Sequence, residues 1–208
     1  LPQPVLAAVV IAALTHALSL APFIRLWHLK RDVLLAAGAA VAVIFFGVLN
    51  GMLIAIGLSI ALVVQRLVSP RVAKLGRLGK SHDFVDITRH SDAAEIPNLA
   101  IWRPSVPLLF ANADSIFRFI GNDALARPAL KGIIVSLEES IDLDSTSFEV
   151  IAAFDAAMTK TGKDVQLARV HDRVRDVLAS GGLHTLTARC NYSVDDAVAA
   201  LTKKTHVK

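Results

Sequence analysis

Residues 33–64 read VLLAAGAAVAVIFFGVLNGMLIAIGLSIALVV, a run of 32 residues without Asp, Glu, Lys or Arg. A single helix over this run would be about 48 Å long, whereas the hydrocarbon core of a bilayer is about 30 Å thick. Two crossings of about 16 residues fit that thickness better, with a turn in the glycine-containing segment 47–51. The run therefore predicts a membrane hairpin with spans at about 33–48 and 51–66.

Basic residues flank this run on both sides and support the hairpin. Three precede it and five follow it: Arg25, Lys30 and Arg31, then Arg66, Arg71, Lys74, Arg77 and Lys80. Loops rich in Lys and Arg lie on the cytoplasmic face of a membrane. Two crossings place both clusters on that face, whereas one crossing would separate them. We therefore expect the part of the chain that follows the hairpin to be cytoplasmic.

A second charge-free run, Val5–Ile24, predicts another span at about 5–22. Its His16 either handles protons or anions or, as we favour, donates to a carbonyl of a neighbouring helix. The mixed apolar and basic segment Phe23–Lys30 predicts a short interfacial helix. No basic n-region or initiating Met precedes the first run, so we expect a truncated chain rather than a signal peptide. Residues 1–68 are thus predicted to form a bundle of three transmembrane helices.

Charge divides the chain into two parts. Residues 1–80 carry eight Lys or Arg against one acid, and residues 81–208 carry fourteen against seventeen Asp or Glu. An acidic soluble part without a basic stripe is a poor nucleic-acid binder, so we expect no nucleic-acid partner. The single Cys190 excludes an intramolecular disulfide and a cysteine-based zinc site.

The soluble part alternates β-rich and helical patterns, which predicts a small mixed sheet with helices packed on it. We place a cytoplasmic linker at 69–81, within a polar connection that extends to residue 98, and a soluble α/β domain at 82–208. The predicted strands are 99–103, 108–111, 132–137 and 164–170, and the predicted helices are 114–126, 147–160, 172–180 and 194–203.

The most informative motif of this domain is the loop Asp144-Ser145-Thr146 before a predicted helix. Thr146 and Glu149 fit a capping box, with Thr146 as the N-cap. The free N–H groups of a helix start also favour an added phosphate, so the loop has two interpretations: a helix cap, which the spacing favours, or a phosphorylation site. The acidic residues around it lack the pattern of a calcium loop and are expected to be solvated. We expect no metal, no cofactor and no enzyme activity, because nucleotide-binding and hydrolase motifs are absent from the sequence.

Scattered motifs in a fixed order resemble the SulP-type anion transporters, or sulfate permeases, which end in a cytoplasmic STAS domain. They are Leu1-Pro2 before Val5–Ile11, the exit Arg66–Pro70, Leu75-Gly76-Arg77, Phe84–Ile87, Ile96-Pro97 and Pro107–Ala113. The resemblance covers essentially the whole chain and implies a STAS domain at 82–208. It also implies that the three spans are the last of the transporter and that the anion-binding residues lie upstream of Leu1.

In the same family the Asp144–Thr146 loop corresponds to a loop whose second hydroxyl is phosphorylated in the soluble anti-sigma antagonists. The resemblance thereby implies Thr146, with Ser145 beside it, as the modified position. Ser147 stands where Gly is usual in the family, and Phe148 where Leu is common.

Two functions follow as hypotheses. The first is a secondary transporter of inorganic anions such as sulfate or bicarbonate, in the inner (plasma) membrane, with a cytoplasmic regulatory STAS domain. The second is a STAS interaction module that the spans merely anchor to the bilayer. A homodimer and a regulatory protein that binds the STAS domain are the partners that either hypothesis allows.

Overall fold

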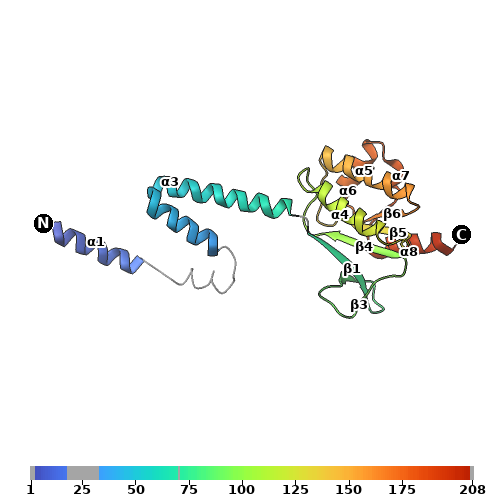
Figure 1. Cartoon of the computed structure of the whole chain (residues 1–208), viewed down its shortest axis with the longest axis horizontal. Helices are drawn as coiled ribbons and strands as arrows, with labels where there is room; N and C mark the ends of the chain where they lie inside the picture. The colour runs from blue at the N-terminus through green and yellow to red at the C-terminus, as the bar shows by residue number, and fades with distance from the viewer. Residues whose placement is uncertain (1–2, 18–32, 70, 207–208) are drawn as a thin grey trace. The chain divides into compact units, whose positions relative to one another are not determined.

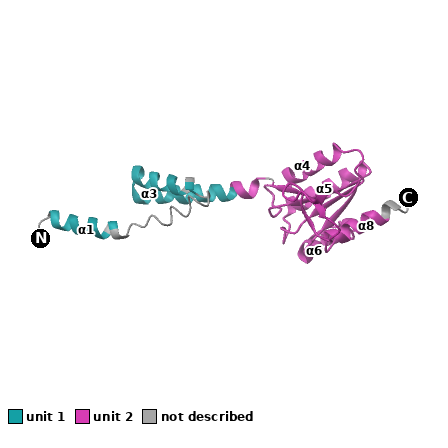
Figure 2. Ribbon diagram, turned by 90° about the horizontal axis from the view of Figure 1, so that it is seen from below, with its two compact units in different colours: residues 1–64 teal, residues 65–208 magenta. Residues whose placement is uncertain are grey.

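A computed structural model of the chain describes residues 3–17, 33–69 and 71–206. They belong to two compact units, Leu1–Val64 and Gln65–Lys208 (Figure 2). The predicted interfacial helix at Phe23–Lys30 and the last part of the first predicted span, residues 18–22, lie outside the described residues.

The first unit contains helix α1 (Gln3–Ala17) and most of helix α3 (Val33–Val68). Helix α3 bends sharply at Gly47, where φ is 77° and ψ is 171° (Figure 1). Glycine adopts positive φ without steric cost, so the chain reverses where the sequence offers one. Beyond the bend the two arms approach closely: a Cβ on Gly51 would lie 2.4 Å from the Cα of Val43. The chain thus reverses at the glycine-containing segment, as predicted.

Only part of the span prediction is supported by length and composition. Among the described residues one helix segment, Ala36–Val68, is long and apolar enough to cross a membrane, with a mean hydropathy of 2.5 over its most apolar window. Pro4–Ala13 is a shorter apolar helix. The count of three membrane spans therefore remains a prediction.

The second unit is an α/β domain with a mixed sheet. Its strands are β1 (Val72–Leu78), β2 (Phe84–Asp86), β3 (Ala93–Ala94), β4 (Leu99–Pro104), β5 (Gly132–Ser136), β6 (Asp164–Ala168) and β7 (Cys190–Asn191). Its helices are α4 (Ala113–Leu125), α5 (Ser145–Lys160), α6 (Asp172–Ser180), α7 (His184–Thr187) and α8 (Val194–His206).

The described strands form one sheet in the order β2-β1-β4-β5-β6-β7, with β3 also pairing with β1. Strands β4 to β7 are parallel, and β1 pairs antiparallel with β2, β3 and β4. Helices α4, α5, α6 and α7 cover one face, where Phe117 packs on Phe154 at a ring-centroid distance of 4.9 Å. Helix α8 covers the other face through Val194, Ala197 and Leu201. The predicted mixed sheet with packed helices is confirmed.

Three local predictions were wrong. Residues 72–78, assigned to the linker and the polar connection, form strand β1 and pair with three other strands. Residues 108–111, predicted as a strand, form the loop before α4, since the amides of Asn112 and Ala113 turn back to the carbonyl of Leu109. Helix α5 begins at Ser145 and not at residue 147.

Candidate functional site

The candidate site is the loop at the start of α5, and Asp144 organises it. The carboxylate Oδ1 of Asp144 accepts a hydrogen bond from the amide of Ser147 at 2.7 Å. Asp144 is therefore the N-cap, because it satisfies an amide that has no partner within the helix. The prediction that Thr146 is the N-cap of a capping box was wrong, and Thr146 lies in the first turn of α5.

A second loop is joined to this site by the other oxygen of Asp144. Oδ2 accepts a hydrogen bond from the amide of Phe110 at 2.6 Å. Nearby, the hydroxyl of Ser140 accepts one from the amide of Leu108 at 3.0 Å. The Asp144 loop and the Pro107–Ala113 segment, distant in sequence, are thus held side by side.

The side chain of Asn112 stabilises the conformation of the Pro107–Ala113 segment. This side chain is 1% exposed. Its Oδ1 accepts from the amide of Leu109, and its Nδ2 donates to the carbonyls of Pro107 and Leu67. A buried amide whose donors and acceptor are all engaged specifies one backbone conformation.

The hydrogen bonds also set the charge of Asp144. Burial raises the pKa of its carboxyl, but the amide donors of Ser147 and Phe110 outweigh burial. The pKa of Asp144 is lowered as a result. Asp144 is therefore ionised at neutral pH, and a negative charge stands at the N-terminus of α5, where the helix dipole stabilises it.

The two hydroxyl residues of the loop are accessible. Ser145 and Thr146 are exposed, whereas Ser147 is fully buried. Two large apolar side chains of the neighbouring loop segments are also exposed, Phe110 at 71% and Ile141 at 68%. The site thus presents two accessible hydroxyls beside one carboxylate.

Two of the acidic residues before the loop make ion pairs at the surface. Glu138 pairs with Arg169 at 3.1 Å, and Asp142 pairs with Arg173 at 2.9 Å. Within the part of the chain that the structure describes, no three His, Cys, Asp or Glu side chains gather in a way that would hold a metal ion.

The Asp144–Thr146 loop is recognisable in the sequence, but its contacts with other segments are not. The contacts of Asp144 with Phe110 and of Ser140 with Leu108 join segments more than 30 positions apart. The hydrophobic pattern carries no signal for such a contact. The motif Pro107–Ala113 is part of the family resemblance, but its contact with the Asp144 loop was not predicted.

Residues 90–197 match the STAS domain family. The chain belongs to that family. This match covers more than half of the chain, including both loops of the candidate site.

Similar proteins extend beyond the STAS domain. The chain is 27% identical over 216 residues to high affinity sulfate transporter 2 of Stylosanthes hamata, covering 98% of the chain and 33% of the relative. It is 27% identical over 184 residues to a probable sulfate transporter of Mycobacterium tuberculosis, covering 88% and 33%. The chain therefore spans about a third of the length of these relatives.

The fold is shared with a solved transporter structure. The structure of SLC26A9 matches with a TM-score of 0.76 and 16% identity, over 90% of this chain and 33% of that one. Together with the sulfate transporters, this likeness supports the assignment of the chain to the carboxyl-terminal region of SulP-type anion transporters.

Proposed function

We propose that this chain is the carboxyl-terminal part of a secondary transporter for inorganic anions, such as sulfate or bicarbonate, and that its STAS domain regulates the transporter from the cytoplasm. One observation carries the proposal: similarity to sulfate transporters runs through the apolar helices as well as the STAS domain, over 98% of the chain. A STAS module attached to an unrelated anchor would match over the domain alone.

The membrane arrangement that we propose has three spans, in an inner (plasma) membrane. The observed reversal at Gly47 supports two of them, and the basic residues on both flanks support a cytoplasmic STAS domain. The anion site is expected in parts of the transporter upstream of this chain. We expect no catalytic activity, no metal and no cofactor in this part.

Transport is tested with the complete reading frame that contains these residues, reconstituted in liposomes. We expect uptake of labelled sulfate or bicarbonate, and none with residues 1–208 alone. If the complete protein moves neither of these anions nor dicarboxylates, the alternative of a membrane-anchored STAS interaction module is supported instead.

Topology is tested by labelling single engineered cysteines in intact cells. Burial raises the pKa of the native Cys190 thiol to about 11, which suppresses its reaction with maleimides. Asn50→Cys is expected to react from outside the cell, and Lys80→Cys only after the membrane is permeabilised. The reverse pattern would place the STAS domain outside the cytoplasm and contradict the proposal.

We further propose that the Asp144–Thr146 loop is the regulatory surface, at which a partner protein binds according to the phosphorylation of Thr146 or Ser145. A phosphate there would add a charge of about −2. It would lie beside the ionised Asp144 and the apolar side chains of Phe110 and Ile141. Such a change in charge would alter the affinity of any protein that docks on these residues.

Mass spectrometry of the protein from its native cell tests this switch. We expect phosphate on Thr146 or Ser145 under some growth condition, and its loss in the Thr146→Ala and Ser145→Ala variants. Thr159→Ala, at an exposed position near the other end of α5, is the matched control. Absence of phosphate under all conditions would leave the loop with its structural role alone.

A further inference from the structure

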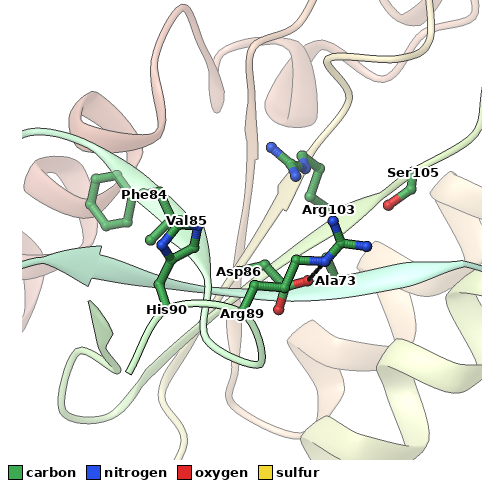
Figure 3. A pocket seen from close by; sticks show the side chains of 8 residues that line it. All are labelled: Ala73, Phe84, Val85, Asp86, Arg89, His90, Arg103 and Ser105. Atoms are coloured by element: carbon green, nitrogen blue, oxygen red, sulfur yellow. Dashed lines mark ion pairs between the residues drawn. The ribbon is translucent and has the colours of Figure 1, made fainter. Parts of the chain in front are cut away.

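A polar pocket of about 310 Å³ lies in the α/β domain, and none of its lining residues belongs to the Asp144 loop (Figure 3). It is formed by β1, β2, the turn after β2 and the end of β4. The residues that give it chemical character are Asp86, Arg89, His90, Arg103 and Ser105. In Figure 3 a dashed line joins Arg89 to Asp86, and the side chains of Arg103 and Ser105 line the same pocket.

The alternation of side chains along two strands explains why polar groups meet here. Leu75 and Ile101 are opposite each other on β1 and β4 and belong to the core beneath α8. Two residues further along, Ala73 is opposite Arg103 on the same face. Ala73 packs at the edge of the hydrophobic cluster, and both Ala73 and Arg103 line the pocket.

Among the described residues, the guanidinium groups of Arg89 and Arg103 make only long contacts with carboxylates of the protein. The Nε of Arg89 is 3.9 Å from Asp86 Oδ2, and the Nη1 of Arg103 is 3.9 Å from Glu138 Oε2. Both distances exceed that of a hydrogen bond. Glu138 makes a shorter contact, of 3.1 Å, with Arg169. Because a guanidinium has five N–H donors, each of the two arginines can bind an oxyanion.

The pocket also contains an acceptor. Oδ1 of Asp86 accepts two hydrogen bonds from Thr88, one from its amide at 2.9 Å and one from its hydroxyl at 2.7 Å. These bonds, together with the nearby arginines, lower the pKa of Asp86, so this carboxylate is ionised at neutral pH. Oδ2, which lies on the side of Arg89, retains acceptor capacity.

Arginine donors beside an ionised carboxylate select among oxyanions. Sulfate has no hydrogen to donate, so one of its oxygens would face the Asp86 carboxylate without a hydrogen bond between them. An oxyanion that keeps a proton at neutral pH can donate that hydrogen to the carboxylate while its other oxygens accept from the arginines. The Asp86 side chain is 19% exposed, so a ligand that covers it without donating a hydrogen leaves a carboxylate oxygen unpaired, which disfavours sulfate.

We propose that this pocket binds a protonated oxyanion of the hydrogen phosphate class, with Arg89 and Arg103 donating to its oxygens and Asp86 Oδ2 accepting its hydrogen. The ligand is inorganic phosphate or the monoester of a small phosphorylated metabolite, which share this chemistry. The site is separate from the Asp144 loop and from the transported anion, and it holds whether or not the transport proposal does.

Equilibrium dialysis of the purified 208-residue chain in detergent tests the site, with labelled inorganic phosphate and labelled sulfate at matched ionic strength. We expect saturable binding of one phosphate per chain and binding of sulfate at least about tenfold weaker. Absence of saturable phosphate binding, or equal binding of sulfate, would overturn the proposal.

Three variants assign the binding to named groups. Arg103→Gln is expected to weaken phosphate binding by about tenfold. Arg118→Gln, which removes the same charge from α4, where Arg118 pairs with Asp114, is the matched control and should bind as the unmodified chain does. Asp86→Asn is expected to bring the phosphate and sulfate affinities within about threefold of each other. Equal losses in both arginine variants, or an unchanged preference in Asp86→Asn, would contradict the assignment.

Competition identifies the source of the ligand. If glycerol 3-phosphate displaces labelled phosphate at a lower concentration than unlabelled phosphate does, the site is assigned to a phosphate monoester. If unlabelled phosphate is the better competitor, the site is assigned to the inorganic ion.

Discussion

The α3 hairpin and the STAS domain place their large apolar side chains in opposite ways. Ile56 of the hairpin is 54% exposed, whereas Ile134 at the centre of the sheet is fully buried. The hairpin arms are joined by a close approach of small residues, with Gly51 against the backbone of Val43. In the STAS domain, interlocking side chains and buried hydrogen bonds hold the helices against the sheet. The first pattern suits a lipid solvent and the second suits water.

Replacement by lysine at two equally exposed apolar positions should therefore have different free-energy costs. Ile56 and Phe119 are 54% and 52% exposed, one on α3 and the other on α4. We expect Ile56→Lys to disfavour membrane insertion by about 3 kcal/mol, because a lysine near the centre of a span loses its hydration. Phe119→Lys should change the free energy of unfolding of the domain by less than about 0.5 kcal/mol, since it is in water already.

Insertion is measured by protease protection of the hairpin in membranes, and domain stability by thermal unfolding of the same preparations. Full insertion of the Ile56→Lys variant would contradict the view that this face contacts lipid. A large loss of domain stability in Phe119→Lys would show that α4 packs against something there.

Close approach at glycine occurs in both regions, but with different neighbours. A Cβ on Gly181 would lie 2.3 Å from the ring of Phe148, a side chain, whereas one on Gly51 would meet the backbone of Val43. We expect Gly181→Ala to destabilise the domain by about 2 kcal/mol, since the ring must move. The second substitution Phe148→Leu, which replaces the ring by a smaller side chain, should restore most of this loss.

In the hairpin, a second substitution should not restore the stability that Gly51→Ala removes. Because the neighbour of Gly51 is main chain, Gly51→Ala should separate the arms, and the second substitution Val43→Ala should not bring them together. Helix content and thermal stability of the four variants, measured by circular dichroism in detergent, distinguish the two cases. Failure of Phe148→Leu to rescue Gly181→Ala would show that the crowding has another source.

These contrasts explain which features could be predicted from sequence. The hairpin turn was located because hydropathy, bilayer thickness and flanking charge each act locally on the residues that carry them. Strand β1 was missed because its Lys74 and Arg77 were attributed to the membrane flank, and because most of its residues are only partly buried. The N-cap was misplaced because Asp144, Ser145 and Thr146 all suit that position, and the choice is fixed by Phe110, 34 residues away. The pocket is formed by residues from three separate segments, so no local sequence pattern indicates it.

The smallest expected effect is a change in the stability of the STAS domain at acidic pH. Asp144→Ala should destabilise the domain by about 1 kcal/mol through loss of the helix cap. The pKa of Asp144 is lowered from 3.8 on folding, so its contribution is complete above about pH 4. The contribution decreases as pH falls through the folded value, because protons then bind the unfolded chain more readily than the folded one.

Asp144→Asn keeps a capping oxygen but removes the charge, so its stability should depend less steeply on pH below about pH 4 than that of the unmodified chain. The hairpin provides the internal comparison, since the run 33–64 contains no carboxyl group whose protonation could destabilise it. Acid titration followed by circular dichroism in detergent should therefore show loss of the STAS domain signal before loss of the helical signal of α3. Simultaneous loss of both would mean that the two regions do not unfold independently, and that the hairpin depends on the domain for its stability.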